Sequence, residues 1–228
     1  MRNTFNLVWK LFVIALAAGL VLGLVNEITR GPIKAQEEII AGESRFKAFL
    51  AYDNDEGQKV IKDKDGNEIP AAVCETEEGS GIYYLYALDD PQKKPIAYAS
   101  SAKAKGYKDL VEVVAAVDMN GKIINVVIGE NQEFAETAGL GSKIKEHCFT
   151  NQFKRYVYTG KELEFGEHAD GYIIKAGSLK VEKNDSCNPE GSEVFDAVSG
   201  ATFSSNAALD ALNQVLAKLY GVINGGAD

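Results

Sequence analysis

The residues with the clearest chemical potential lie near the C-terminus, in the segment Asp196-Ala-Val-Ser-Gly-Ala-Thr202-Phe-Ser-Ser205. Small residues at 199, 200 and 201 form a loop that brings the Thr202 hydroxyl to the start of a predicted helix. Unpaired N–H groups and the helix dipole make such a place favourable for a phosphate. Gly200 and Ala201 leave room for a bulky group beside the backbone. On these features alone, an ordinary loop with a helix cap is the commoner explanation.

The helix that would present this threonine is predicted from leucine spacing. Residues 206–220 place leucines at 209, 212, 216 and 219, which is the spacing of one buried helix face. Ser204 or Ser205 supplies the N-cap, and Gly221 predicts the end of the helix. Such a helix needs a sheet or another helix to cover its leucines.

Two other segments could contribute to a site beside that helix. Glu136-Thr137-Ala138-Gly139-Leu140-Gly141 is a glycine-punctuated loop. It precedes a predicted helix over 142–147, for which Ser142 is the expected N-cap. Tyr107 follows Gly106 just before a long hairpin, either facing the site or packed in the core.

The sheet that must hold these loops is predicted from hairpin signals. Residues 110–118 and 122–128 are nearly continuous apolar runs joined by Asn120-Gly121, a pair typical of type I′ turns. We expect both faces of these strands to be covered and the strands to lie centrally in the sheet. Asp65-Gly66 predicts a second hairpin, and residues 82–88 and 95–101 a further strand pair. The fold class is therefore α+β, with a mostly antiparallel sheet and packed helices.

The N-terminal segment predicts a membrane anchor. Residues 11–25 lack any polar side chain, and a helix over 5–25 would rise about 31 Å, enough to cross the hydrocarbon core. A cleaved signal peptide is the alternative, but residues 26–30 offer no small-x-small cleavage site. We expect a cytoplasmic 1–6, a transmembrane helix over 7–25, a membrane-proximal helix and strands over 26–100, and the functional domain over 101–228. An amphipathic helix over 36–52 leaves the membrane.

Composition excludes several classes of function. The 24 basic and 33 acidic residues give a net charge of −9, which argues against a nucleic-acid partner. The two histidines, His147 and His168, lie apart, and Cys74, Cys148 and Cys187 form no CxxC motif. We therefore expect no metal or iron–sulfur site. Two of the three cysteines could form a disulfide outside the cytoplasm.

Taken together, these motifs resemble the FMN-binding domain family, whose members serve the Rnf ion-translocating electron-transport complex and the sodium-pumping NADH:quinone reductase. Ser199-Gly200-Ala201-Thr202 resembles the family's flavinylation motif, and residues 136–141 resemble its Glu-Thr-Pro-Gly-Leu-Gly loop, with Ala138 in place of the proline. Gly106-Tyr107 and the aromatic pair Phe149 and Phe153 also match. The resemblance favours the Rnf type, because the only tryptophan, Trp9, lies in the anchor.

This resemblance implies that FMN is joined to Thr202 through a phosphoester bond that a flavin transferase installs. Ser199, Gly200 and Ala201 would admit the ribityl chain. The loop with Glu136, Thr137, Leu140 and Gly141 would contact the isoalloxazine, through Leu140 packing and backbone N–H groups, although Glu136 could instead only hold the loop. Tyr107 would pack near the ring.

The implied function is an electron-carrying redox subunit of an Rnf-type translocase, which couples ferredoxin:NAD electron transfer to Na⁺ or H⁺ movement. Its partners would be the other subunits, the transferase and, through one helix, the bacterial inner membrane, with the domain on the periplasmic side. The chain would not be a complete enzyme alone. The alternatives are a flavinylated domain of another extracytoplasmic reductase, or an anchored binding module without flavin.

Overall fold

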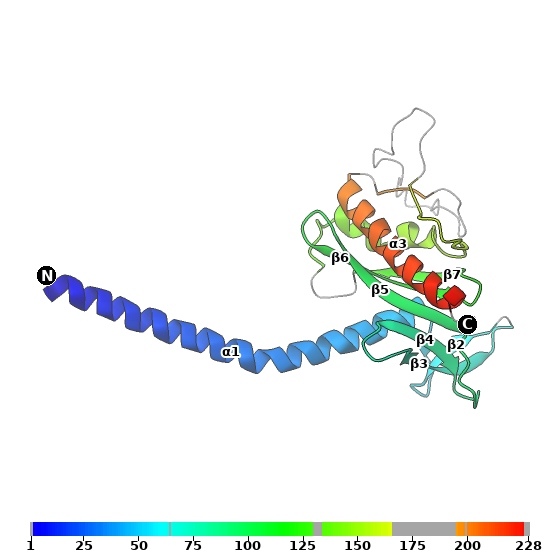
Figure 1. The fold of residues 1–228 in the computed structure, drawn as a ribbon, viewed down its shortest axis with the longest axis horizontal. Coiled ribbons are helices and arrows are strands. Elements are labelled where there is room, and N and C mark those ends of the chain that lie inside the picture. Colours follow the sequence, from blue (N-terminus) through cyan, green and yellow to red (C-terminus); the bar gives the residue numbers. More distant parts are fainter. Residues whose placement is uncertain (1, 64, 130–133, 166–194, 199, 226–228) are drawn as a thin grey trace. The chain divides into compact units, whose positions relative to one another are not determined.

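The computed structural model describes residues 2–63, 65–129, 134–165, 195–198 and 200–225 (Figure 1). Two compact units divide the chain, Met1–Ile40 and Ala41–Asp228. His168 and Cys187 fall outside the described residues. Among the described cysteines, Cys148 is disulfide-bonded and Cys74 is free.

Helix α1 runs from Arg2 to Ala48 with Pro32 inside it. The two helices predicted for this region are thus one continuous helix, which ends where Leu50 takes a left-handed φ of +59°. From Val8 to Ile28 its large apolar side chains are exposed, and the helix is long and apolar enough to cross a membrane. Its last residue, Ala48, is buried in the second unit.

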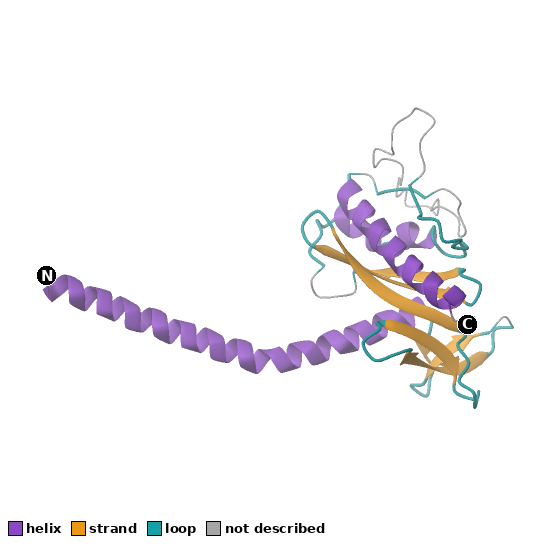
Figure 2. Ribbon diagram, in the orientation of Figure 1, coloured by secondary structure: helices purple, strands orange, loops and turns teal. Residues whose placement is uncertain are grey.

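Seven strands form one antiparallel sheet in which every strand pairs with its neighbours in the chain (Figure 2). The strands are β1 (Tyr52–Asp53), β2 (Lys59–Lys62), β3 (Glu68–Glu75), β4 (Ile82–Ala87), β5 (Ala97–Lys105), β6 (Leu110–Asp118) and β7 (Ile123–Ile128). Helix α3 (Thr202–Gly225) packs across β5 and β6 (Figure 1). The predicted α+β class, with one apolar N-terminal helix and an antiparallel sheet, is confirmed.

Strand β6 contributes side chains to two hydrophobic cores, because its residues alternate between the two faces of the sheet. Val113 and Val117 point to the core shared with Leu212 of α3, while Val114 and Ala116 point to the core that includes Ala48. The prediction that both faces are covered is confirmed. The predicted central position is wrong for β7, which is the last strand of the sheet. Part of its outer edge is paired instead by a loop, since Arg155 N–H donates to Ile123 O at 2.7 Å.

The β6–β7 turn also differs from the predicted type I′. Only Gly121 has a positive φ, +75°, whereas type I′ requires positive φ at both central residues. The reason is Asp118, whose Oδ1 accepts the N–H groups of Asn120 at 2.8 Å and Lys122 at 3.0 Å. Asp63 does the same for the predicted hairpin at Gly66, accepting from the N–H groups of Asp65 and Asn67 at 2.8 Å.

The predicted ends of the last helix are wrong. Helix α3 begins at Thr202, so Ser204 and Ser205 lie inside its first turn and are not N-caps. It passes through Gly221, because the cost of about 1 kcal/mol for a helical glycine is offset by Val222 and Ile223 packing against the core.

The helix predicted over 142–147 is two short elements, the 3₁₀ helix η1 (Gly141–Lys145) and α2 (His147–Asn151). Ser142 lies within η1 and is therefore not its N-cap. Its Oγ instead accepts the Gly139 N–H at 2.9 Å, which closes the loop that precedes η1.

Candidate functional site

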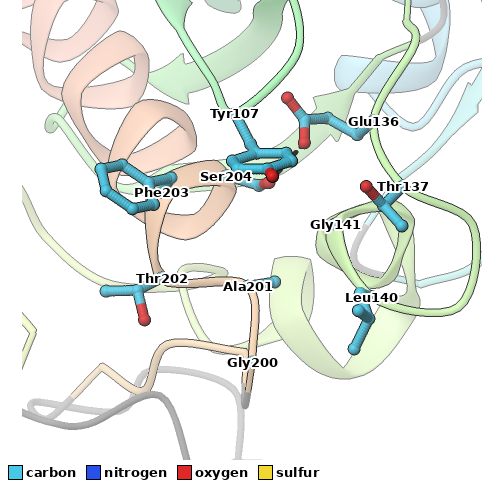
Figure 3. A pocket seen from close by; sticks show the side chains of 10 residues that line it. All are labelled: Tyr107, Glu136, Thr137, Leu140, Gly141, Gly200, Ala201, Thr202, Phe203 and Ser204. Carbon is cyan, nitrogen blue, oxygen red and sulfur yellow. Dashed lines mark hydrogen bonds between the residues drawn. The ribbon is translucent and has the colours of Figure 1, made fainter.

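Three segments that are distant in the sequence meet around a cavity of about 350 Å³ (Figure 3). They are the loop before β6, the loop at 136–141 and the start of α3. The residues that line the cavity are Tyr107, Glu136, Thr137, Leu140, Gly141, Gly200, Ala201, Thr202, Phe203 and Ser204. Every predicted site residue is in this set except Ser199, which lies outside the described residues. Phe203 and Ser204 were not predicted to belong to the site.

Glu136 joins the three segments through its buried carboxylate. Oε2 accepts the Ser204 hydroxyl at 2.6 Å, and Oε1 accepts the Lys108 N–H at 3.1 Å. The side chain is only 9% exposed, so these bonds replace water that the carboxylate has lost. Glu136 thus accepts a backbone N–H, as one of the two roles considered for it requires, but that N–H belongs to the loop before β6 and not to the loop at 136–141. Its position on the cavity wall is also compatible with contact to a ligand.

Two glycines make room for this carboxylate. A Cβ at Gly106 would overlap Glu136 Oε1, and one at Gly141 would lie 2.7 Å from Glu136 Oε2 and from Ser204 Oγ. Both distances are too short for carbon and oxygen atoms, so any side chain at either position would displace Glu136. The glycines of the two loop motifs thus serve the bond between the loops and α3.

The loop before α3 is fixed by buried hydrogen bonds. Gln152, which is fully buried, donates through Nε2 to Asp196 O at 3.0 Å and accepts the Asp196 N–H through Oε1 at 2.7 Å. Ser205 Oγ accepts the Val198 N–H at 2.9 Å. This explains why Ser205 does not cap the helix: its hydroxyl holds the incoming loop.

The first intrahelical bond of α3 is donated by Ser205 N–H to Ala201 O at 2.9 Å. The N–H groups of Thr202, Phe203 and Ser204 precede that bond and point out of the helix start, where the helix dipole is positive. The Thr202 side chain is exposed at the same place. A phosphate linked to this hydroxyl would therefore meet a favourable electrostatic environment.

Gly200 brings the loop close to the opposite wall. Its φ is +75°, a backbone conformation that glycine adopts without strain. A Cβ at this position would lie 3.3 Å from Leu140 Cδ2. Leu140 is 45% exposed, so it presents apolar surface to the cavity opening. In the loop at 136–141, which holds Leu140, two N–H groups already donate hydrogen bonds. The Gly139 N–H donates to Ser142 Oγ, and the Leu140 N–H donates to Thr137 O.

Two exposed aromatic side chains flank the start of α3. Tyr107 is 65% exposed and Phe203 is 71% exposed, and their ring centroids are 6.4 Å apart (Figure 3). The alternative of a core tyrosine at 107 is therefore wrong. A signal for Phe203 was present in the sequence. This aromatic residue directly follows Thr202 and does not lie on the leucine face of the helix.

Residues 106–217 match the family model described as FMN-binding domain. This part of the chain is an FMN-binding domain. The matched residues include all three segments of the cavity, and the aromatic pair Phe149 and Phe153 is buried within them, with ring centroids 5.5 Å apart.

One similar protein is the G subunit of the proton-translocating ferredoxin:NAD(+) oxidoreductase complex from Clostridium ljungdahlii. It is 25% identical over 215 residues, which cover 94% of this chain and 91% of that protein. The C subunit of the Na(+)-translocating NADH-quinone reductase from Parabacteroides distasonis is 20% identical, with a TM-score of 0.38, over 62% of this chain and 63% of that structure. NqrC from Shewanella oneidensis is 16% identical, with a TM-score of 0.42, over 78% and 72%.

Proposed function

We propose that this FMN-binding domain carries its FMN as a phosphoester of Thr202. We further propose that the chain is the electron-carrying subunit of an Rnf-type membrane complex that couples ferredoxin:NAD electron transfer to movement of Na⁺ or H⁺. Support for the second part comes from the similarity to the G subunit of the Clostridium ljungdahlii complex, which extends over nearly the whole of both chains.

The observation that carries the attachment site is the position of the Thr202 hydroxyl at the first turn of α3, on the wall of a cavity of about 350 Å³. That volume lies at the lower end of the range for small-molecule sites. The aromatic side chains of Tyr107 and Phe203 line this cavity and are exposed. A group tethered at Thr202 could thus lie across the opening, with part of its planar ring accessible.

The residues of the chain have separate tasks in this proposal. Thr202 holds the phosphate, and the N–H groups of the first turn stabilise its charge. Gly200 and Ala201 leave space for the ribityl chain. Leu140, Tyr107 and Phe203 provide apolar and aromatic surface for the ring. FMN itself supplies the one- and two-electron chemistry.

Co-expression of the full chain with a flavin transferase tests the attachment site. The denatured protein should keep flavin fluorescence on a gel, and the Thr202→Val variant should lose it. Thr137→Val is the matched control, because Thr137 is another threonine on the cavity wall. If Thr202→Val stays fluorescent, or if Thr137→Val alone loses the flavin, then Thr202 is not the attachment residue.

The membrane side follows from the same proposal. We propose that α1 anchors the chain in the bacterial inner membrane, with residues 26–228 on the periplasmic side. The flavin transferase would modify the domain on that side, and the other subunits of the complex would be the partners of the chain. Added protease should degrade the domain in spheroplasts and leave it intact in inverted vesicles. The opposite pattern would overturn this orientation.

A further inference from the structure

A second cavity, of about 460 Å³, lies where the end of α1, strand β7 and helix α2 meet. It shares no lining residue with the cavity at Thr202. Neither the family motifs nor the proposed flavin site accounts for it.

The charge of this second cavity differs from that of the chain. Its charged or titratable lining residues are Lys47, Lys145, His147 and Lys154, and none of the described residues that line it is acidic. The chain as a whole has a net charge of −9. Basic side chains gathered around a concavity reinforce one another, since low-dielectric walls focus their field. Among the described residues, the lining of this cavity is therefore basic, on a chain that is acidic as a whole.

Part of the wall of the cavity is apolar, beside the polar Asn125 and Thr150. Val127 of β7 and Leu50, two residues past the end of α1, supply exposed or half-buried apolar surface, whereas Val126 and Ile128 line the cavity but are almost fully buried in the core. Leu50 is 52% exposed and has a φ of +59°, so the chain holds this side chain at the surface in a backbone conformation that costs free energy. The Nζ of Lys145 lies 4.7 Å from the centroid of the Phe134 ring, which fixes one of the cations without neutralising it.

We propose that this cavity binds an organic anion that has an apolar body. The anionic group, a phosphate, carboxylate or sulfonate, pairs with Lys145 and Lys154 near His147. The apolar body lies against β7 and Leu50. This combination of basic rim and apolar wall fits neither a bare inorganic ion nor a neutral apolar ligand, and it does not depend on the flavin at Thr202.

Calorimetric titration of the full chain in a non-ionic detergent with phenyl phosphate tests the proposal. We expect one phenyl phosphate to bind per chain. Lys145→Ala/Lys154→Ala should weaken it by roughly tenfold, since each partly exposed ionic contact contributes a factor of a few. Lys122→Ala/Lys161→Ala is the matched control, because these exposed lysines lie outside the cavity and remove the same charge. Leu50→Ser should weaken phenyl phosphate but not inorganic phosphate.

The absence of phenyl phosphate binding at millimolar concentration would overturn the proposal. An equal loss in the two double variants would also overturn it, because the effect would then reflect net charge and not this cavity. The Thr202→Val variant should bind phenyl phosphate as the wild type does, which separates this site from a failure of the proposed flavin attachment.

The anion could be a free small molecule or an acidic side chain of a partner subunit, and amine labelling distinguishes these sources. Lys145 and Lys154 are labelled in intact membranes and in the purified chain, and modified peptides are quantified by mass spectrometry. Protection that survives extensive washing of the membranes identifies a partner's acidic group. Protection that washing removes identifies a small molecule. Equal labelling before and after purification would contradict occupancy by either source.

Discussion

Glu136 should be the residue on which the geometry of the Thr202 cavity depends most. It is buried, and its two oxygens bond the loop before β6 and the first turn of α3. Replacement by alanine would leave the Lys108 N–H and the Ser204 hydroxyl without their acceptor. The segments that Glu136 connects would then be held only by packing.

The expected cost follows from the two bonds. Hydrogen bonds to a charged group contribute about 1.5–3 kcal/mol each, and water from the cavity can replace part of that loss. We therefore expect Glu136→Ala to lower the free energy of unfolding by about 3 kcal/mol. For a domain of this size that corresponds to a fall in Tm of roughly 6–12 °C. Glu136→Gln should cost only about 1–2 kcal/mol, because its amide can still accept from Lys108 and donate to Ser204 Oγ.

Thermal unfolding of the full chain without co-expressed transferase measures these differences free of any flavin contribution. Glu112→Ala is the matched control, because the Glu112 carboxylate lies 3.9 Å from Lys103 Nζ in a partly exposed pair and should contribute less than about 1 kcal/mol. A double-mutant cycle with Ser204→Ala should show coupling above about 0.5 kcal/mol. The reasoning is refuted if Glu136→Ala unfolds at the temperature of Glu112→Ala, or if the cycle shows no coupling.

Three other perturbations have expected outcomes. Gly200→Ala should lower the free energy of unfolding by about 1–2 kcal/mol, because φ is +75° and the new Cβ would lie 3.3 Å from Leu140. Urea unfolding measures this cost, and Gly57→Ala, at an open position with φ +73°, gives the cost of backbone strain without the contact. Phe203→Ala and Tyr107→Ala should change stability by less than about 0.5 kcal/mol yet alter the visible circular dichroism of bound flavin; an unchanged spectrum would contradict their place beside the ring. Hydrogen bonds from the Asn67 side chain and from backbone N–H groups lower the pKa of Asp63 below its ordinary 3.8. Its stabilisation is therefore present above that pH and lost as pH falls through the lowered pKa, so the stability difference between wild type and Asp63→Asn should shrink in acid.

Sequence reasoning identified most of the cavity wall because motif residues carry their chemistry in their type. Gly200 and Thr202 could be chosen by size and hydroxyl, and both line the cavity. The roles of Ser204 and Ser205 could not be found in this way. A serine at a helix start is normally a cap, and only the fold shows that one bonds Glu136, 68 positions away in the sequence, and the other bonds Val198.

The errors in the sheet have a similar cause. The apolar run at 123–128 correctly indicated that both faces of β7 are covered, but coverage does not distinguish a central strand from a last strand whose edge is paired by a loop. That loop, at 155–158, has no strand pattern of its own. Likewise, Asn120-Gly121 is a favoured type I′ pair, but the carboxylate of Asp118 accepts two backbone N–H groups and selects a different turn.

The openness of the Thr202 cavity is consistent with attachment by a covalent bond. A site that binds a cofactor reversibly must bury most of it to offset the entropy of association. A tether replaces that requirement with a high effective concentration, so the walls need only orient the ring. Tyr107 and Phe203, both more than half exposed, suit such a site, because an accessible ring edge allows electron exchange with a docked partner. The rigid part of the site is then the Glu136 junction that fixes the start of α3, and not the aromatic rim.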